Sequence, residues 1–179
     1  MAMTLLTTNT GSGVTASAFT SSIDSTYKLY IFKYYEVNPA ADGSNFQFQA
    51  NAAGASGYNE TITSSFFAAR HNEDDSTTEG PSYTAAYDLA QGTDGQYLTA
   101  DAANDADASV AGEFFLFNPS NTTYVKHWQA RTNAMNDGGM SYATFVSGYF
   151  DTTTAIDDIK FFLEGGGAFD AVIKMYGVG

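Results

Sequence analysis

The sequence contains no cysteine and is poor in basic residues. Its 179 residues include seven Lys and Arg against twenty Asp and Glu, which gives a formal net charge of −13. Without cysteine the chain forms neither a disulfide nor a cysteine-ligated metal site. Nucleic-acid binding through a basic patch needs clustered Lys and Arg, so no nucleic-acid partner is predicted. No apolar run approaches the roughly eighteen residues that a membrane helix needs, so no membrane partner is predicted either.

Signals for helices and for export are also missing. No stretch of eleven or more residues has apolar positions at helical spacing. The Ala-rich segment 100–111 is interrupted by Asp and Asn and is predicted to be a loop, and 81–91 is predicted to hold a short helical turn. Residues 1–23 carry no charged side chain. They lack the basic start of a signal peptide, so we expect synthesis in a cytoplasm without export by that route.

Aromatic residues are abundant and follow strand patterns. Twelve Tyr, fourteen Phe and one Trp make up 15% of the chain, a composition that argues against intrinsic disorder. In 45–49, Phe46 and Phe48 are expected to point inward while Gln47 and Gln49 point outward. Strands are predicted at 27–37, 45–49, 61–70, 113–118, 123–132, 142–150, 159–163 and 169–175.

Short strands separated by turn residues indicate an all-β fold, specifically an antiparallel, jelly-roll-like β-sandwich of about eight to ten strands. We expect one such domain over 23–179, preceded by an uncharged N-terminal arm, 1–22. The arm is expected either to add a strand to its own sheet or to dock on a neighbouring subunit. The last two strands flank the Gly-rich segment 164–168, which predicts a hairpin.

The negative charge is concentrated in the middle of the chain. Residues 42–113 hold twelve acidic residues and only Arg70 as a base, a net charge of −11, whereas the two flanking parts together carry −2. We expect the central segment to face solvent and the nearly neutral remainder, including the arm, to face an assembly.

One acidic loop has oxygen ligands at a spacing that suits calcium. Asp101, Asn104, Asp105 and Asp107 lie within seven positions, and calcium takes six to eight oxygen ligands. The glycine and the terminal glutamate of an EF-hand are absent, so a solvated loop is the favoured interpretation and calcium binding is the alternative.

A second acidic group follows a histidine, in the order His71, Glu73, Asp74, Asp75. Paired carboxylates can act as acid and base, and Glu73 with Asp75 would serve a polysaccharide hydrolase. A hydrated turn is the favoured interpretation. Because no nucleophile elbow, phosphate loop or zinc motif is present, we predict a non-enzymatic protein with no catalytic, cofactor-binding or metal-binding residues and no cofactor.

The aromatic side chains have two alternative interpretations. Trp128 and the tyrosines would suit a sugar-stacking platform, but aromatic residues in strands more often form a core or a subunit interface. Both faces of 30–35 are apolar. This pattern favours an interface between copies of the chain, in a trimer or a larger assembly.

Several short segments resemble a family of small β-rich structural proteins of tailed bacteriophages, especially marine ones. The resemblance implies a virion component with a jelly-roll-like fold, no catalysis and homo-oligomerisation. The segments that carry it are IDSTY (23–27), YIF (30–32), DLAQ (88–91), FNPS (117–120), VKH (125–127), GYF (148–150), TTTAID (152–157) and IKMYGV (173–178).

The resulting functional hypothesis is a virion structural protein that decorates or cements a capsid, or forms a head appendage. Its expected partners are other copies of itself and virion proteins such as the capsid. Its expected location is the virion, after synthesis in the host cytoplasm. The alternative is a receptor- or carbohydrate-binding module of a tail fibre.

Overall fold

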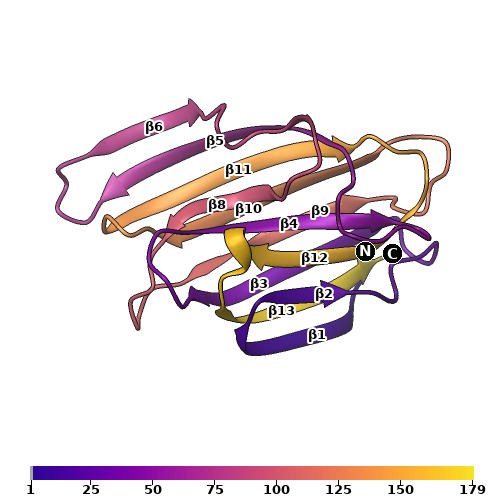
Figure 1. The fold of residues 1–179 in the computed structure, drawn as a ribbon, viewed down its shortest axis with the longest axis horizontal. Helices are drawn as coiled ribbons and strands as arrows, with labels where there is room; N and C mark the ends of the chain where they lie inside the picture. The colour runs from indigo at the N-terminus through magenta and orange to yellow at the C-terminus, as the bar shows by residue number, and fades with distance from the viewer. Residues whose placement is uncertain (1) are drawn as a thin grey trace.

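The computed structural model describes residues 2–179 and contains thirteen β-strands and one short 3₁₀ helix (Figure 1). In most of the strands the side chains point alternately into and out of the core. No helix of the described residues is long and apolar enough to cross a membrane. The elements are β1 (Met3–Val14), β2 (Ala16–Phe19), β3 (Leu29–Pro39), β4 (Ser44–Ala52), β5 (Ile62–Asn72), β6 (Thr78–Tyr83), β7 (Ala90–Gly92), β8 (Gln96–Ala102), β9 (Val110–Phe117), β10 (Lys126–Met135), β11 (Met140–Phe150), β12 (Ile156–Leu163), η1 (Glu164–Gly166) and β13 (Phe169–Val178).

Two antiparallel sheets pack face to face. The large sheet has nine strands in the order β1-β13-β3-β9-β10-β11-β5-β6, with β7 also paired to β5, and the small sheet has the order β2-β12-β4-β8. The predicted all-β antiparallel sandwich is therefore confirmed.

Eight of the strands form a jelly roll. β1 pairs with β13, β2 with β12, β3 with β9 and β4 with β8, so the chain makes one long antiparallel ribbon whose two arms run in opposite directions. The ribbon is rolled so that β13 also pairs with β3 and β12 also pairs with β4. This connectivity, with strands alternating between two sheets, is that of a double-sheet jelly roll.

Two insertions widen the large sheet. β10 and β11 follow β9 along the chain, β5 to β7 follow β4, and together they extend the sheet beyond β9. In Figure 1, β11, β5 and β6 lie above β9, and the end of the sheet formed by β5 and β6 projects to the left past the small sheet. The outer face of this extension carries the groove described below.

The strand count exceeds the eight to ten predicted because β1, β2, β6, β7 and β8 lack an aromatic, alternating pattern. Segment 81–91 contains no helix, only a single turn in which the Tyr87 N–H donates to the Thr84 carbonyl at 3.1 Å. Pro81 lies in β6, an edge strand, where a missing N–H does not break a ladder. The Ala-rich segment 100–111 is a loop only in its middle, because Ala100 and Ala102 are fully buried in β8. Burial thus outweighs the weak strand propensity of alanine.

The predicted C-terminal hairpin is wrong. β12 belongs to the small sheet and β13 to the large sheet, and no pairing joins them. Gly165 and Gly166 have φ angles of 70° and 76°, which a side chain would disfavour, and they turn the chain from one sheet to the other. The inward faces that suggested a hairpin instead face each other across the core.

The N-terminal arm contributes strands to both sheets. β1 pairs with β13 at one edge of the large sheet, and β2 pairs with β12 at one edge of the small sheet. Asn9 holds the two together by donating from its side-chain amide to the carbonyl of Ala18 at 2.9 Å. Of the two alternatives for the arm, addition to its own sheets is therefore the one observed.

The core between the sheets is built from aromatic rings. Phe46, Phe48, Phe114 and Phe161 are fully buried, and their rings contact one another or shared neighbours across the sandwich. Aromatic pairs at 4.5–7 Å add about 0.5–1.5 kcal/mol each beyond their burial. The predicted inward positions of 45–49 and of the last two strands are confirmed.

Gln47 and Gln49 face away from the core but are not exposed. Loops cover this side of the small sheet, and the Gln49 side chain is fully buried beneath them. Its amide nitrogen donates to the carbonyl oxygens of Glu60, Thr93 and Asp94 at 2.9, 3.2 and 3.0 Å. Backbone carbonyls that are shielded from water need hydrogen-bond donors. The Gln49 amide supplies such a donor to two loops and so holds both of them against β4.

Replacing Gln49 with leucine is expected to lower the free energy of unfolding by about 2–3 kcal/mol, because three loop carbonyls at this partly buried contact lose their donor. Urea unfolding followed by fluorescence measures the change. Gln129→Leu, at an exposed glutamine of β10, is the matched control and should stay within about 0.5 kcal/mol. Equal effects in the two variants would show that the Gln49 contacts do not hold the loops.

Candidate binding surface on the large sheet

No layer of the described chain covers the outer face of the large sheet. The four strands at one edge of this sheet, β1, β13, β3 and β9, present an apolar patch on that face. The patch consists of two cross-strand rows on β1, β13, β3 and β9. Met3 and Leu5 are about half exposed, at 49% and 51%. No member carries a charge. One row consists of Met3, Val178, Leu29 and Phe117. The other consists of Leu5, Tyr176, Ile31 and Phe115.

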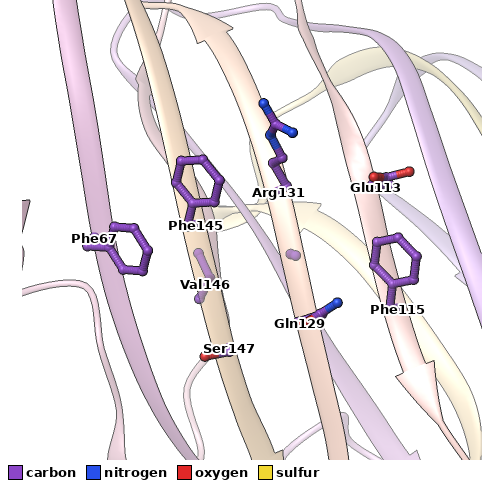
Figure 2. Close-up of a pocket in the computed structure, with 9 residues that line it drawn as sticks. Phe67, Glu113, Phe115, Gln129, Arg131, Phe145, Val146 and Ser147 are labelled. Atoms are coloured by element: carbon purple, nitrogen blue, oxygen red, sulfur yellow. The ribbon is translucent and has the colours of Figure 1, made fainter. Parts of the chain in front are cut away.

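Beyond this patch, the outer face is hollowed into an aromatic groove. The groove crosses β9, β10, β11 and β5 and encloses about 360 Å³. Figure 2 shows phenylalanines at its two sides and polar side chains of β10 between them. Its lining side chains on the outer face are Phe67, Glu113, Phe115, Gln129, Arg131, Phe145 and Ser147.

One wall of the groove is a stacked pair of rings. Phe67 and Phe145 are cross-strand partners on β5 and β11, with ring centroids 5.2 Å apart and planes 10° apart. Phe115 forms the opposite wall on β9, two strands away from Phe145. All three rings come from strand positions whose neighbours on either side point into the core, so the sandwich itself fixes their direction.

The groove carries one positive charge, the Arg131 guanidinium, and Glu113 lies directly opposite it in the β9–β10 pairing. The Arg131 guanidinium lies over the Phe145 ring, 5.4 Å from its centroid, and makes no ion pair within the described residues. Glu113 is neutralised by Lys33, whose Nζ lies 3.4 Å from a carboxylate oxygen. An arginine that contacts an aromatic ring and makes no ion pair keeps its donors available for a planar anion.

A second hollow continues the groove along the strands. It shares Gln129 and Ser147 with the first and adds His127 and Tyr149, whose rings lie 5.9 Å apart. The floor across both hollows is polar, because Ser65 and Ser147 are paired on β5 and β11 with hydroxyls 3.4 Å apart. The whole depression therefore combines aromatic walls with a floor of amide and hydroxyl groups.

Trp128 does not form a sugar platform. It is 1% exposed and packs in the core, with its ring 4.8 Å from Phe48 and 6.0 Å from Phe114. Trp128 alternates with His127 and Gln129 on β10, which are the outward residues. His127, Gln129 and Arg131 thus share the outer face of β10, and the tryptophan lies on the inner face.

The candidate calcium ligands form turn contacts instead of a cluster. No group of three or more His, Cys, Asp or Glu side chains within residues 2–179 is arranged to hold a metal ion. The Asn104 N–H donates to Asp42, and the Asp105 carbonyl accepts from Asn38. Burial, together with the charge of Asp137, raises the pKa of Asp101. Asp107 lies in the same loop and is exposed.

The acidic group after His71 is an exposed turn between β5 and β6. Hydrogen bonds from the Ser76 side chain and from the Ser76 N–H lower the pKa of Asp74. Asp75 lies 2.9 Å from the His71 ring, and the side chains of both are largely exposed. Glu73 is also exposed. The arrangement matches the hydrated turn favoured from the sequence.

One cation is fully buried. The Lys126 ammonium donates to the carbonyl oxygens of Tyr124 and Thr152 at 2.8 and 3.2 Å, and burial lowers its pKa. These carbonyls belong to the loops before β10 and after β11. Lys126 therefore joins two loops at one end of the sandwich and is closed to ligands.

Searches against protein-family models, curated proteins and solved structures found no match.

Sequence reasoning missed the groove, although a signal was available. Phe66-Phe67 and Phe114-Phe115 are consecutive aromatic residues in strands, and consecutive strand residues point to opposite faces. One ring of each pair must therefore lie on the outside. Phe66 and Phe114 are fully buried, which leaves Phe67 and Phe115 to line the groove.

Proposed function

We propose that the protein is a non-enzymatic structural component of a phage virion, a jelly-roll module that decorates or cements the capsid or forms a head appendage. The eight-strand jelly roll supports this role, because the fold recurs in viral capsid domains. The resemblance of the short segments to phage structural proteins points the same way. Fold alone does not fix function, so the proposal depends on a further observation.

That observation is the uncharged apolar patch. Two copies of a chain with a net charge of −13 repel each other, and the repulsion is smallest where the touching surfaces carry no carboxylates. The patch meets this condition and is formed by β1, β3, β9 and β13, three of which come from the weakly charged ends of the chain. Exposed apolar surface of this kind typically marks an interaction site. We assign it to contact between copies of the chain.

Self-association tests the assignment. Leu5→Glu places a carboxylate in the patch, and we expect the dissociation constant of the oligomer to rise at least tenfold because the charge loses water on association. Sedimentation equilibrium measures it. Tyr124→Glu is the control, because Tyr124 is 69% exposed but lies outside the patch. A wild-type protein that stays monomeric, or oligomers that tolerate Leu5→Glu, would contradict the assignment.

The virion role has its own test. Mass spectrometry of purified virions from a phage that carries this coding sequence should detect the chain at a fixed stoichiometry to the capsid protein. Detection only in infected-cell lysate would refute the role, whatever the oligomeric state.

A further inference from the structure

The aromatic groove has the composition of a ligand site and adjoins the apolar patch, with which it shares Phe115. Small-molecule sites combine apolar walls with a few polar groups that fix orientation. Here the walls are Phe145 and Phe115, and the polar groups are Arg131, Gln129 and Ser147. We propose that the groove binds a saccharide chain bearing a carboxylate, such as a segment of an acidic polysaccharide.

The walls suit sugar rings. A pyranose has a flat face of C–H groups and an edge of hydroxyls, so it packs its apolar face on an aromatic ring while its edge stays hydrated or hydrogen-bonded. Phe145 is held upright by its stack with Phe67 at 5.2 Å, and Phe115 is fixed on β9. Rings held in place by strands lose little conformational entropy on binding.

The floor suits hydroxyl groups. The side-chain amide of Gln129 makes no hydrogen bond within the described residues, and the Ser65 and Ser147 hydroxyls are bonded only weakly to each other at 3.4 Å. Amides and hydroxyls both donate and accept, and sugar hydroxyls do the same. A ligand rich in hydroxyls can therefore use both kinds of group.

Arg131 accounts for the carboxylate. It lies directly opposite Glu113 in the β9–β10 register but makes no ion pair among residues 2–179, and the Glu113 carboxylate pairs with Lys33 instead. A guanidinium binds a carboxylate through two parallel hydrogen bonds. A neutral sugar makes no ion pair with the Arg131 guanidinium, so the acidic form is expected to bind more tightly.

The position of the groove argues against a peptide added as a strand. Strands β9, β10, β11 and β5 are each paired on both sides, so the groove offers no unpaired backbone groups to an extended peptide. Only side chains are presented, which suits a ligand recognised by its ring faces and hydroxyls.

The test compares two ligands that differ only in charge. Isothermal titration would measure binding of a galacturonate oligosaccharide and of its methyl ester, with sialyllactose and its methyl ester as a second pair. We expect each acid to bind at least tenfold more tightly than its neutral partner. Absence of binding by every acidic ligand, or equal affinity for acid and ester, would overturn the proposal.

Variants assign the roles of individual residues. Phe145→Ala should weaken both members of each pair at least tenfold, and Arg131→Gln should remove the preference for the acid while leaving ester binding in place. The matched controls are Tyr35→Ala and Lys174→Gln. These two residues form another cation–π contact on the same face, with the Lys174 ammonium 5.8 Å from the centroid of the Tyr35 ring. Thermal melts verify that the variants are folded.

The proposal does not depend on the virion role, so the two fail separately. If Arg131→Gln altered sedimentation instead of saccharide binding, the groove would be a contact between copies and the saccharide proposal would be overturned. Saccharide binding by a protein absent from virions would leave this proposal intact and refute the other.

Discussion

Replacement of Phe161 by alanine is expected to lower the free energy of unfolding by about 3–5 kcal/mol, the usual cost of emptying a buried phenylalanine site. Phe161 lies on β12, is fully buried, and reaches across the sandwich to rings of both sheets. Strands β3, β4, β9 and β12 around it are each paired on both sides, which limits their collapse into the void. Centroid distances of 5.6–6.3 Å separate its ring from those of Phe19, Phe32, Tyr34, Phe46 and Phe114.

The neighbouring residue gives the control for this variant. Phe162 points to the other face of β12, where it is only partly buried and contacts the Lys160 ammonium at 4.5 Å. Phe162→Ala should cost about 1 kcal/mol, because a cation–π contact near the surface contributes that much or less. Chemical unfolding measures both variants, and similar losses would mean that Phe161 is not at the centre of the core.

Alkaline pH is expected to destabilise the fold strongly between pH 10 and pH 12. Burial raises the pKa of Tyr142 to about 12 and also raises that of Tyr34, which is fully buried. A group whose pKa is higher in the folded state gives stability that is complete below its unfolded pKa, near 10, and is lost as the pH rises. Tyr142 alone should account for about 2 kcal/mol by pH 12, and Tyr34 adds a loss in the same direction.

Phenylalanine variants separate the two contributions. Tyr142→Phe should leave the free energy of unfolding nearly unchanged at pH 8 and should reduce the loss of stability at alkaline pH. Tyr34→Phe should reduce that loss further but cost about 1 kcal/mol at pH 8, because the Tyr34 hydroxyl is bonded to Thr132 at 2.5 Å. Urea unfolding at a series of pH values gives the curves. An unchanged pH profile in both variants would assign the decline to other groups.

The sequence predicted the sandwich because alternation survives wherever one face of a strand is buried. Phe46, Phe48, Ile173 and Met175 follow this rule, and all are buried. Strand pairing was not predictable, because the rule fixes which way a side chain points and not which strand lies alongside. The last two strands illustrate this: their apolar faces are equally compatible with one hairpin and with two opposed sheets.

The candidate binding surface was harder to predict for a related reason. Sequence patterns mark residues that must be inside, whereas an outward phenylalanine such as Phe67 differs from a core phenylalanine only in the register of its strand. Arg131 and Phe145 are 14 positions apart in sequence and meet only because β10 and β11 pair in one register. A binding surface formed by residues of three or four adjacent strands can therefore be identified only once the pairing of those strands is known.

Pairing of the first strand with the last also determines when the protein can fold. β1 ends at Val14 and its partner β13 begins at Phe169, so on a ribosome adding 5–20 residues per second the first strand waits about 10–30 s for its partner. Contacts this distant in sequence make folding slow. During that interval the uncharged edge of one nascent chain is open to the edges of its neighbours, so high rates of synthesis should favour misassembly over correct folding.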